Sequence, residues 1–210
     1  FFTLDGQTIV LDDYLSIRPE QEPRIRRLVQ AGRLLVGPWY ILPDEFLEGP
    51  EALVRNLLFG QRGCRHFSSE PQPMERIAYT PDPFGHISQL PQIAAGLGMD
   101  ALCFWRGVGQ APTEFLWAAP DGTARLVLHL RDSYGNGASL AADEEGFSRD
   151  LAAERDALLP YATTSHLLIM QGTDHMEPRA DLPVRMKAAE AALGERVIHS
   201  TLPAYVAAVQ

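Results

Sequence analysis

Apolar and polar residues alternate along the chain in short blocks that predict helices and strands in turn. Apolar residues at helical spacing predict helices, and short apolar runs that end at glycine, proline or charged residues predict strands. The expected helices cover residues 18–32, 49–63, 88–98, 143–159, 181–194 and 202–210. The expected strands cover residues 1–10, 33–39, 76–80, 101–105, 166–170 and 196–200. Residues 115–130 form two apolar runs around a Pro-Asp-Gly turn, which predicts a hairpin.

Strands of four to six apolar residues that alternate with longer helices are typical of an α/β fold with a parallel sheet. Either an open doubly wound sheet or a closed barrel fits this order. Some helix ends have a specific cause: Gly32 is expected to end the first helix, and Ser88 is a candidate N-cap. Three acidic residues, Asp143, Glu144 and Glu145, are expected to be a solvated helix start.

Composition narrows the classes of protein that fit this pattern. The 210 residues, 46% of them hydrophobic, suit one domain with a substantial core. The 27 acidic residues outnumber the 18 basic ones, and the net charge of −9 argues against nucleic-acid binding. No apolar run approaches the ~20 residues of a membrane span, and no signal peptide is recognisable. The two cysteines, Cys64 and Cys103, are expected to be buried free thiols, which favours a cytoplasmic location.

Ionisable residues gather just beyond the predicted strands. In both architectures binding chemistry lies at the carboxyl ends of the strands, where loops converge. The residues found there are Trp39, Asp44, Glu45, Asp82, His86, Arg106, Asp132, Tyr134, Asp174 and His175. A turn-forming role for Asp82, which precedes Pro83 and Gly85, is the better interpretation from spacing alone. For Asp44 and Glu45 a solvated loop and a site role are equally supported.

Pairing raises the interest of Asp82 and Asp174. Each follows an apolar strand in a turn that contains glycine, so the two carboxylates can face one pocket from different strands. Two such carboxylates are what hydrolysis of a glycosidic bond requires. A competing hypothesis is that Asp82, His86, Asp174 and His175 together bind one cation, but the tight motifs of zinc sites do not occur in the sequence.

Five segments together resemble a known family: DGQTIVLDDYLSIRPE, GRLLVGPWYILPDEFLEGPEALVRNLLFGQR, TPDPFGHISQLPQI, FWRGV and LLIMQGTDHMEP. Their order and spacing are similar to those of the N-terminal catalytic domain of glycoside hydrolase family 38 alpha-mannosidases, with the bacterial branch most similar. The resemblance implies a distorted seven-stranded β/α barrel. Residues 1–210 would then be most of one catalytic domain, without its N-terminal and C-terminal flanks.

The resemblance also implies roles for individual residues. Asp82, in D-P-F-G-H, matches the family's nucleophile, which is also a ligand of a single zinc ion. Asp174, in the G-x-D segment, matches the general acid/base, and Arg106 and Tyr134 resemble sugar contacts. The implied reaction is hydrolysis of terminal alpha-D-mannosides with retention, through a mannosyl-enzyme on Asp82.

The sequence departs from the family at the zinc site. The family completes this site with a His-x-Asp pair near the start of the barrel and a later histidine, and neither is present, so only Asp82 of the four ligands remains. We favour truncation of the chain over a relative that binds no metal, and we expect the isolated piece to bind zinc poorly and to be inactive. A metal-dependent sugar deacetylase and a non-catalytic carbohydrate-binding domain are the alternatives. Whether the full-length protein is a homo-oligomer stays open.

Overall fold

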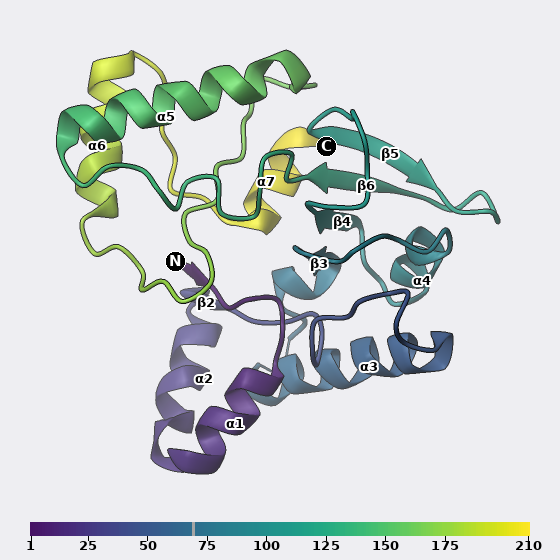
Figure 1. The fold of residues 1–210 in the computed structure, drawn as a ribbon. Coiled ribbons are helices and arrows are strands. Elements are labelled where there is room, and N and C mark those ends of the chain that lie inside the picture. The colour runs from purple at the N-terminus through teal and green to yellow at the C-terminus, as the bar shows by residue number, and fades with distance from the viewer. Residues whose placement is uncertain (69) are drawn as a thin grey trace.

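The computed structural model describes residues 1–68 and 70–210, which form two small β-sheets surrounded by helices (Figure 1). The first sheet pairs β1 (Phe2–Thr3) with β2 (Leu34–Leu35) in parallel. The second sheet has the order β3-β4-β6-β5. Its strands are β3 (Ile77–Thr80), β4 (Ala101–Phe104), β5 (Glu114–Ala118) and β6 (Ala124–His129). β3, β4 and β6 are parallel and β5 is antiparallel to β6, so the α/β class and the hairpin are confirmed.

The helices lie around these sheets (Figure 1). Their bounds are α1 Ile9–Ile17, α2 Glu22–Gln30, α3 Pro50–Phe67, α4 Leu90–Gly96, α5 Glu144–Leu158, α6 Leu182–Leu193 and α7 Leu202–Val209. Short 3-10 turns cover Pro19–Gln21, Pro73–Arg76 and Leu159–Tyr161. None of the helices in the described part of the chain is long and apolar enough to cross a membrane.

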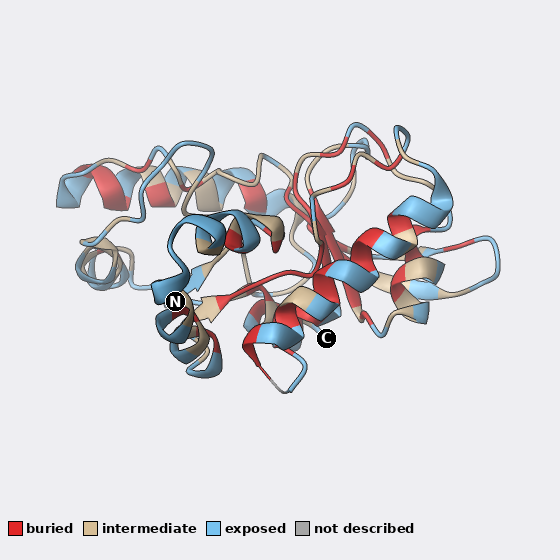
Figure 2. Cartoon of the chain, turned by 90° about the horizontal axis from the view of Figure 1, so that it is seen from below, coloured by how far each residue is buried: buried red, intermediate tan, exposed pale blue. Residues whose placement is uncertain are grey.

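The core lies on both faces of the second sheet, because successive side chains of a strand point to opposite faces. On one face, Tyr79, Cys103 and Leu128 pack against Tyr205 and Val206 of α7. The other face is covered by α3 and α4. The buried residues on this face include Ala78, Leu102 and Phe104 from the strands and Leu53, Leu57, Leu90 and Ala94 from the helices. Figure 2 shows the strands buried in the centre, with the exposed residues on the outer faces of the helices.

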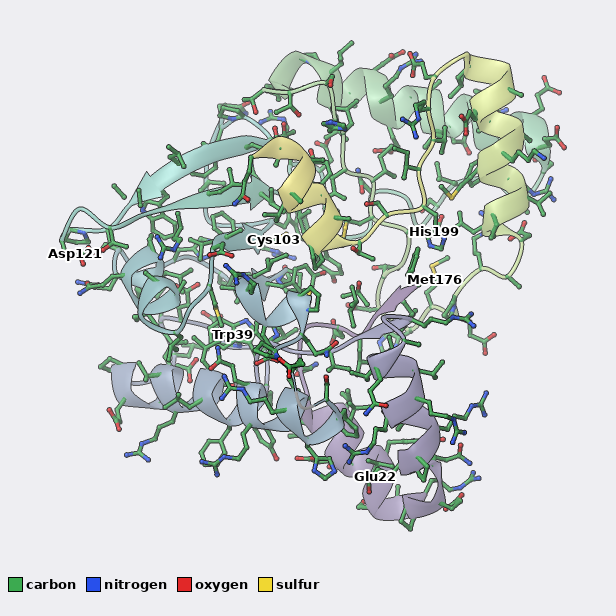
Figure 3. All side chains as sticks on the ribbon, turned by 180° about the vertical axis from the view of Figure 1, so that it is seen from behind. Glu22, Trp39, Cys103, Asp121, Met176 and His199 are labelled. Carbon is green, nitrogen blue, oxygen red and sulfur yellow. The ribbon has the colours of Figure 1, made fainter. Side chains whose placement is uncertain are left out.

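Two smaller clusters hold the remaining helices. Leu11 of α1 and Val29 of α2 pack against Cys64 and Phe67 of α3. At the other end, α5 and α6 share a cluster that is separate from the sheet. Both cysteines are buried and free, as predicted; Figure 3 labels Cys103 on β4. Asp143 caps α5 by accepting a hydrogen bond from the Gly146 N–H at 2.8 Å, which confirms the predicted helix start and lowers the pKa of Asp143.

Several sequence-based predictions are wrong. The strand expected over residues 1–10 ends at Thr3, and α1, which was not predicted, begins at Ile9. The chain turns between them at Gly6, whose φ is 70°. The expected strand 33–39 is reduced to two residues. α4 begins at Leu90 with Gln89 in the N-cap position, and the Ser88 hydroxyl donates to the Gln89 side chain instead of capping the helix.

The structure does not show a seven-stranded barrel. The described residues contain six strands in two sheets, and the segments 166–170 and 196–200 are not strands. The first of these segments still lies beside other backbone: the Gly137 N–H donates to the Met170 carbonyl, while the Met170 N–H donates to the Asn136 side chain, both at 2.8 Å. The Asn136 side chain accepts the hydrogen bond that a backbone carbonyl would accept in a strand pair, so no regular ladder of backbone hydrogen bonds continues there.

Candidate active site

The end of β3 is the fixed point from which the site is built. All four residues of β3 are buried, and the Trp39 indole N–H donates to the Tyr79 carbonyl at 2.9 Å. Trp39 itself is fully buried, and it lies between α3 and the second sheet (Figure 3). Trp39 also forms an isolated parallel β-bridge with Gln7, in the segment that follows β1. Through these two contacts Trp39 connects the segment after β1 to the end of β3, which Asp82 follows.

Asp82 lies at a pocket of about 200 Å³ and is paired with an arginine. The pocket is lined by Leu42, Pro43, Asp44, Thr80, Pro81, Asp82, Pro83 and Phe84. Arg106 follows β4, the strand next to β3, and its Nε contacts Oδ1 of Asp82. The guanidinium also lies over the rings of Trp105 and Phe84, 4.4 and 5.0 Å from their centroids. Aromatic faces and a carboxylate therefore hold Arg106 at the rim.

Asp174 and Tyr134 form the second pair. The Tyr134 hydroxyl donates to Oδ2 of Asp174 at 3.0 Å. Desolvation raises the pKa of Tyr134, and so do this hydrogen bond, the charge of Asp174 and the charge of Asp82. Both carboxylates thus lie within electrostatic reach of one phenol. The four predicted site residues therefore form two pairs, Asp82 with Arg106 and Asp174 with Tyr134, and the charge of Asp82 reaches Tyr134 in the second pair.

Asp5 is a further carboxylate at this site that was not predicted from the sequence. It follows β1, and its Oδ2 accepts a hydrogen bond from the Gln7 side chain at 2.7 Å. Partial desolvation raises the pKa of Asp5 even though the side chain reaches solvent, the Gln7 hydrogen bond lowers it, and the charge of Asp174 raises it further. The Asp-Gly step after the apolar start was the available sign of a strand end, but residues 1–10 were predicted as one strand.

Behind the pocket, Glu45 and His86 form a buried pair. Their side chains are 0% and 4% exposed, and His86 Nδ1 lies 2.7 Å from Glu45 Oε1. The other carboxylate oxygen of Glu45 accepts from the Ile87 N–H at 2.8 Å. The second ring nitrogen of His86 lies 2.9 Å from the Arg106 carbonyl. Glu45 is therefore not in a solvated loop; it holds three loops together.

Two glycines make this close packing possible. A Cβ on Gly107 would lie 2.6 Å from the His86 ring, and one on Gly85 would lie 2.4 Å from the Phe46 ring. Gly107 and Gly85 also have positive φ angles, 88° and 153°, a backbone conformation that residues with a Cβ adopt unfavourably. Any larger residue at Gly107 would displace His86 or the chain after Arg106.

Two candidates do not join the site, and the metal hypothesis gains no support. Asp132 acts on α5, where desolvation and then the charge of Asp132 raise the pKa of Glu154. His175 is exposed, with a positive φ of 58°. In residues 1–68 and 70–210, no three His, Cys, Asp or Glu side chains form a group that could hold a metal ion. Because Arg106 occupies Asp82 and both nitrogens of His86 are engaged, these residues alone do not fit zinc.

Comparison with known proteins identifies the family. The family model for the glycosyl hydrolases family 38 N-terminal domain matches residues 2–210. The chain belongs to glycosyl hydrolase family 38. The predicted membership is thereby confirmed across almost the whole sequence.

Relatives within family 38 are similar in sequence and in structure. The chain is 40% identical over 205 residues to a putative mannosylglycerate hydrolase of Halalkalibacterium halodurans, a match that covers 90% of this chain and 22% of that protein. It is 34% identical over 120 residues to human alpha-mannosidase 2C1, covering 53% of this chain and 11% of that protein. An alpha-mannosidase from Enterococcus faecalis V583 superposes on all of this chain and 24% of its own, with a TM-score of 0.93 and 35% identity. The chain therefore spans about a quarter or less of each relative.

Proposed function

We propose that the protein containing this chain hydrolyses terminal alpha-D-mannosides with retention of configuration. The observation that carries the proposal is the placement of Asp82 and Asp174, which come from separate loops and both act on Tyr134. A retaining glycosidase needs one carboxylate as the nucleophile and a second as the acid and base. Family 38 membership and the two relatives named alpha-mannosidase support mannosides as the substrates.

In the proposed reaction, Asp82 attacks the anomeric carbon while Asp174 gives a proton to the leaving oxygen. A bond forms between the Asp82 carboxylate and the sugar as the glycosidic bond breaks. Asp174 then takes a proton from water, whose oxygen displaces Asp82 from the sugar. The two carboxyl groups are expected to lie about 5–5.5 Å apart during this sequence.

The two partner residues suit these roles. Arg106 contacts one oxygen of Asp82, and we propose that the other oxygen attacks the substrate. The Tyr134 hydroxyl stays protonated because its pKa is raised, so it keeps donating to Asp174 and fixes the direction of that carboxylate. Tyr134 and Arg106 are also proposed to contact hydroxyl groups of a sugar bound between the two carboxylates.

Zinc and the substrate are finer parts of the proposal. A zinc ion at Asp82 requires ligands from residues outside this chain, and no step above depends on it. The chain is proposed to be most of a β/α-barrel catalytic domain that needs flanking residues for activity. The name of the Halalkalibacterium halodurans relative makes mannosylglycerate the first natural substrate to test.

The experiment uses the longest natural polypeptide that contains this chain and an aryl alpha-mannoside. We expect hydrolysis with the alpha anomer formed first, followed directly by NMR. Asp82→Asn is expected to abolish turnover, and a 2-fluoro-mannosyl fluoride is expected to label Asp82, as peptide mass spectrometry would show. A chelator tests whether zinc is needed. Normal turnover by Asp82→Asn would refute the nucleophile.

The alternatives predict different results in the same experiment. A sugar deacetylase forms no covalent intermediate, so release of acetate without labelling of Asp82 would support it. A carbohydrate-binding domain would bind mannosides without hydrolysing them. Either outcome would replace the mannosidase proposal.

A further inference from the structure

The buried pair formed by Glu45 and His86 is the least exposed ionisable contact near the pocket, yet neither side chain lines the pocket. Glu45 comes from the loop before α3, and His86 from the loop after β3. Their partners are the Ile87 N–H and the Arg106 carbonyl, so the pair joins three loops that meet at the carboxyl ends of the strands. Such a pair connects the outer loop 44–48 to the residue that contacts Asp82.

Both ring nitrogens of His86 have a hydrogen-bond partner, which fixes the orientation of the imidazole. The Arg106 carbonyl can only accept, so His86 Nε2 carries hydrogen. The other nitrogen, Nδ1, faces Glu45 Oε1, so one more hydrogen lies between these two atoms. The Phe104 ring lies against His86 with centroids 3.9 Å apart and the ring planes tilted by 36°, and the Trp117 ring meets His86 edge-on, so the imidazole orientation is fixed on several sides.

The contact to Arg106 is made by the main chain, and it determines where the side chain starts. β4 ends at Phe104, and the backbone then continues through Trp105 and Arg106 to Gly107. The His86 donor holds the Arg106 carbonyl, while the missing Cβ of Gly107 lets the ring lie against the next residue. Because the Arg106 guanidinium reaches Asp82 from this point, a shift of the carbonyl would move the guanidinium away from the carboxylate.

We propose that Glu45 and His86 are positioning residues that hold the Arg106 main chain where its guanidinium can pair with Asp82. The inference rests on the proposed function only for its kinetic consequence; the positioning itself is a property of the folded chain. A purely structural role for the pair would make its loss costly for stability without a specific effect on Arg106.

Two substitutions of His86 separate these roles. In His86→Asn the amide nitrogen lies near the place of Nδ1, so the Glu45 contact is kept and the Arg106 contact is lost. In His86→Gln the longer side chain places its amide near Nε2, so the Arg106 contact is kept. Glu114→Gln is the matched control, since Glu114 is another buried, hydrogen-bonded glutamate that is distant in contacts from Arg106.

The first readout is NMR of the longest natural polypeptide that contains the chain, and it does not depend on catalysis. We expect the Arg106 Nε–H resonance, assigned by its loss in Arg106→Lys, to be protected from exchange in the wild type, in His86→Gln and in Glu114→Gln. In His86→Asn the protection should be lost while the backbone spectrum stays folded. Retained protection in His86→Asn would overturn the proposal, and so would equal loss in His86→Gln and Glu114→Gln. If His86→Asn does not fold, His86→Ser, whose side chain is too short to reach the Arg106 carbonyl, takes its place in the comparison.

The second readout is hydrolysis of an aryl alpha-mannoside by the longest polypeptide that contains the chain. We expect kcat to fall by at least about tenfold in His86→Asn with KM within about threefold, because misplaced catalytic groups reduce kcat. His86→Gln and Glu114→Gln should stay within about threefold of the wild-type kcat. Equal kcat values in His86→Asn and His86→Gln would overturn the proposal. An inactive wild type would instead refute the proposed function and leave the NMR result to decide the positioning role.

Discussion

Two buried glutamates hold different parts of this molecule together. Glu45 accepts from His86 and the Ile87 N–H and so fixes the loops beside Asp82. Glu114, at the start of β5, accepts from the Tyr205 hydroxyl at 2.5 Å and thereby ties α7 to the sheet. The two residues are similarly buried, with 3% and 6% of the whole residue exposed, but one network leads to Arg106, a proposed substrate contact, and the other does not. Burial of a carboxylate alone therefore says little about its role.

The two glutamate networks differ in the side chains that donate hydrogen bonds to each glutamate. The remaining donors to Glu114 are the hydroxyls of Thr113 and Thr163, at 2.8 and 2.7 Å, so all its side-chain donors are neutral. Desolvation, and then the contact with Glu114, raise the pKa of Tyr205 far above its usual range, so its hydroxyl remains a donor at any ordinary pH. Glu45 instead faces an imidazole whose second nitrogen continues to Arg106. A chain of contacts passes through His86, whereas the contacts at Glu114 end in helix and loop backbone.

The largest expected effect comes from Gly107→Ala, which would disturb the His86 ring in the Glu45 network. The new Cβ would lie 2.6 Å from the His86 ring at a residue with a φ of 88°. We expect a loss of about 3–4 kcal/mol in the free energy of unfolding, from backbone strain and overpacking together. Urea denaturation of the 210-residue chain measures this loss.

Gly32→Ala is the control for this substitution. Gly32 has a similar positive φ, 64°, but nothing lies within 4 Å of the added Cβ. It should lose only about 1–2 kcal/mol, the cost of the left-handed backbone. Equal losses in the two variants would mean that the His86 ring yields easily, and the tight packing of the site loops would then be wrong.

Tyr205→Phe is the corresponding test of the Glu114 side, and its expected effect is smaller. Removing the hydroxyl takes one of three side-chain donors from Glu114 and leaves the ring in the core. We expect a loss of about 1–3 kcal/mol in the free energy of unfolding, the usual cost of an unpaired buried acceptor. The kcat of the longest natural polypeptide that contains the chain should be unchanged. A fall in kcat comparable to that of His86→Asn would remove the distinction between the two networks.

The sequence predicts one of these networks better than the other. Asp82, His86 and Arg106 were predicted as strand-end residues, because apolar strands and a glycine turn mark where each lies. Glu45 was undecided, since its neighbours in sequence look like a solvated loop and its partner is 41 residues away. Glu114 and Tyr205 are 91 residues apart, and no local pattern indicates that they meet.

The fold has the same limit. The buried strands β3, β4 and β6 and the hairpin follow from local apolar patterns. The segments 166–170 and 196–200 have the same patterns and are not strands, because strand formation depends on a neighbouring backbone that local sequence does not specify. Asp5 was missed for a related reason: its place in the site comes from β1 lying beside β2, a pairing between residues about thirty positions apart.

His129 lies on the strand between the two networks, and His129→Gln gives the smallest expected effect. Its Nε2 lies 3.2 Å from the Trp105 carbonyl, and burial lowers its pKa below the ordinary value of 6.5. The unfolded chain therefore binds a proton more readily than the folded one, so stability is fully present above this value and falls as the pH drops below it. Gln keeps a donor for Trp105 and removes the titration. The wild type should thus lose more stability than His129→Gln between about pH 7.5 and pH 5.

Urea denaturation at the two pH values measures this difference, and Tyr205→Phe serves as the control. Tyr205→Phe leaves His129 in place, so it should keep the pH dependence of the wild type while being less stable at both values. A pH dependence in His129→Gln as steep as that of the wild type would show that other groups cause the acid loss. If Tyr205→Phe instead flattened the pH dependence, the Glu114 network would itself titrate in this range. The distinction between the hydroxyl donors of Glu114 and the imidazole beside Glu45 would then fail.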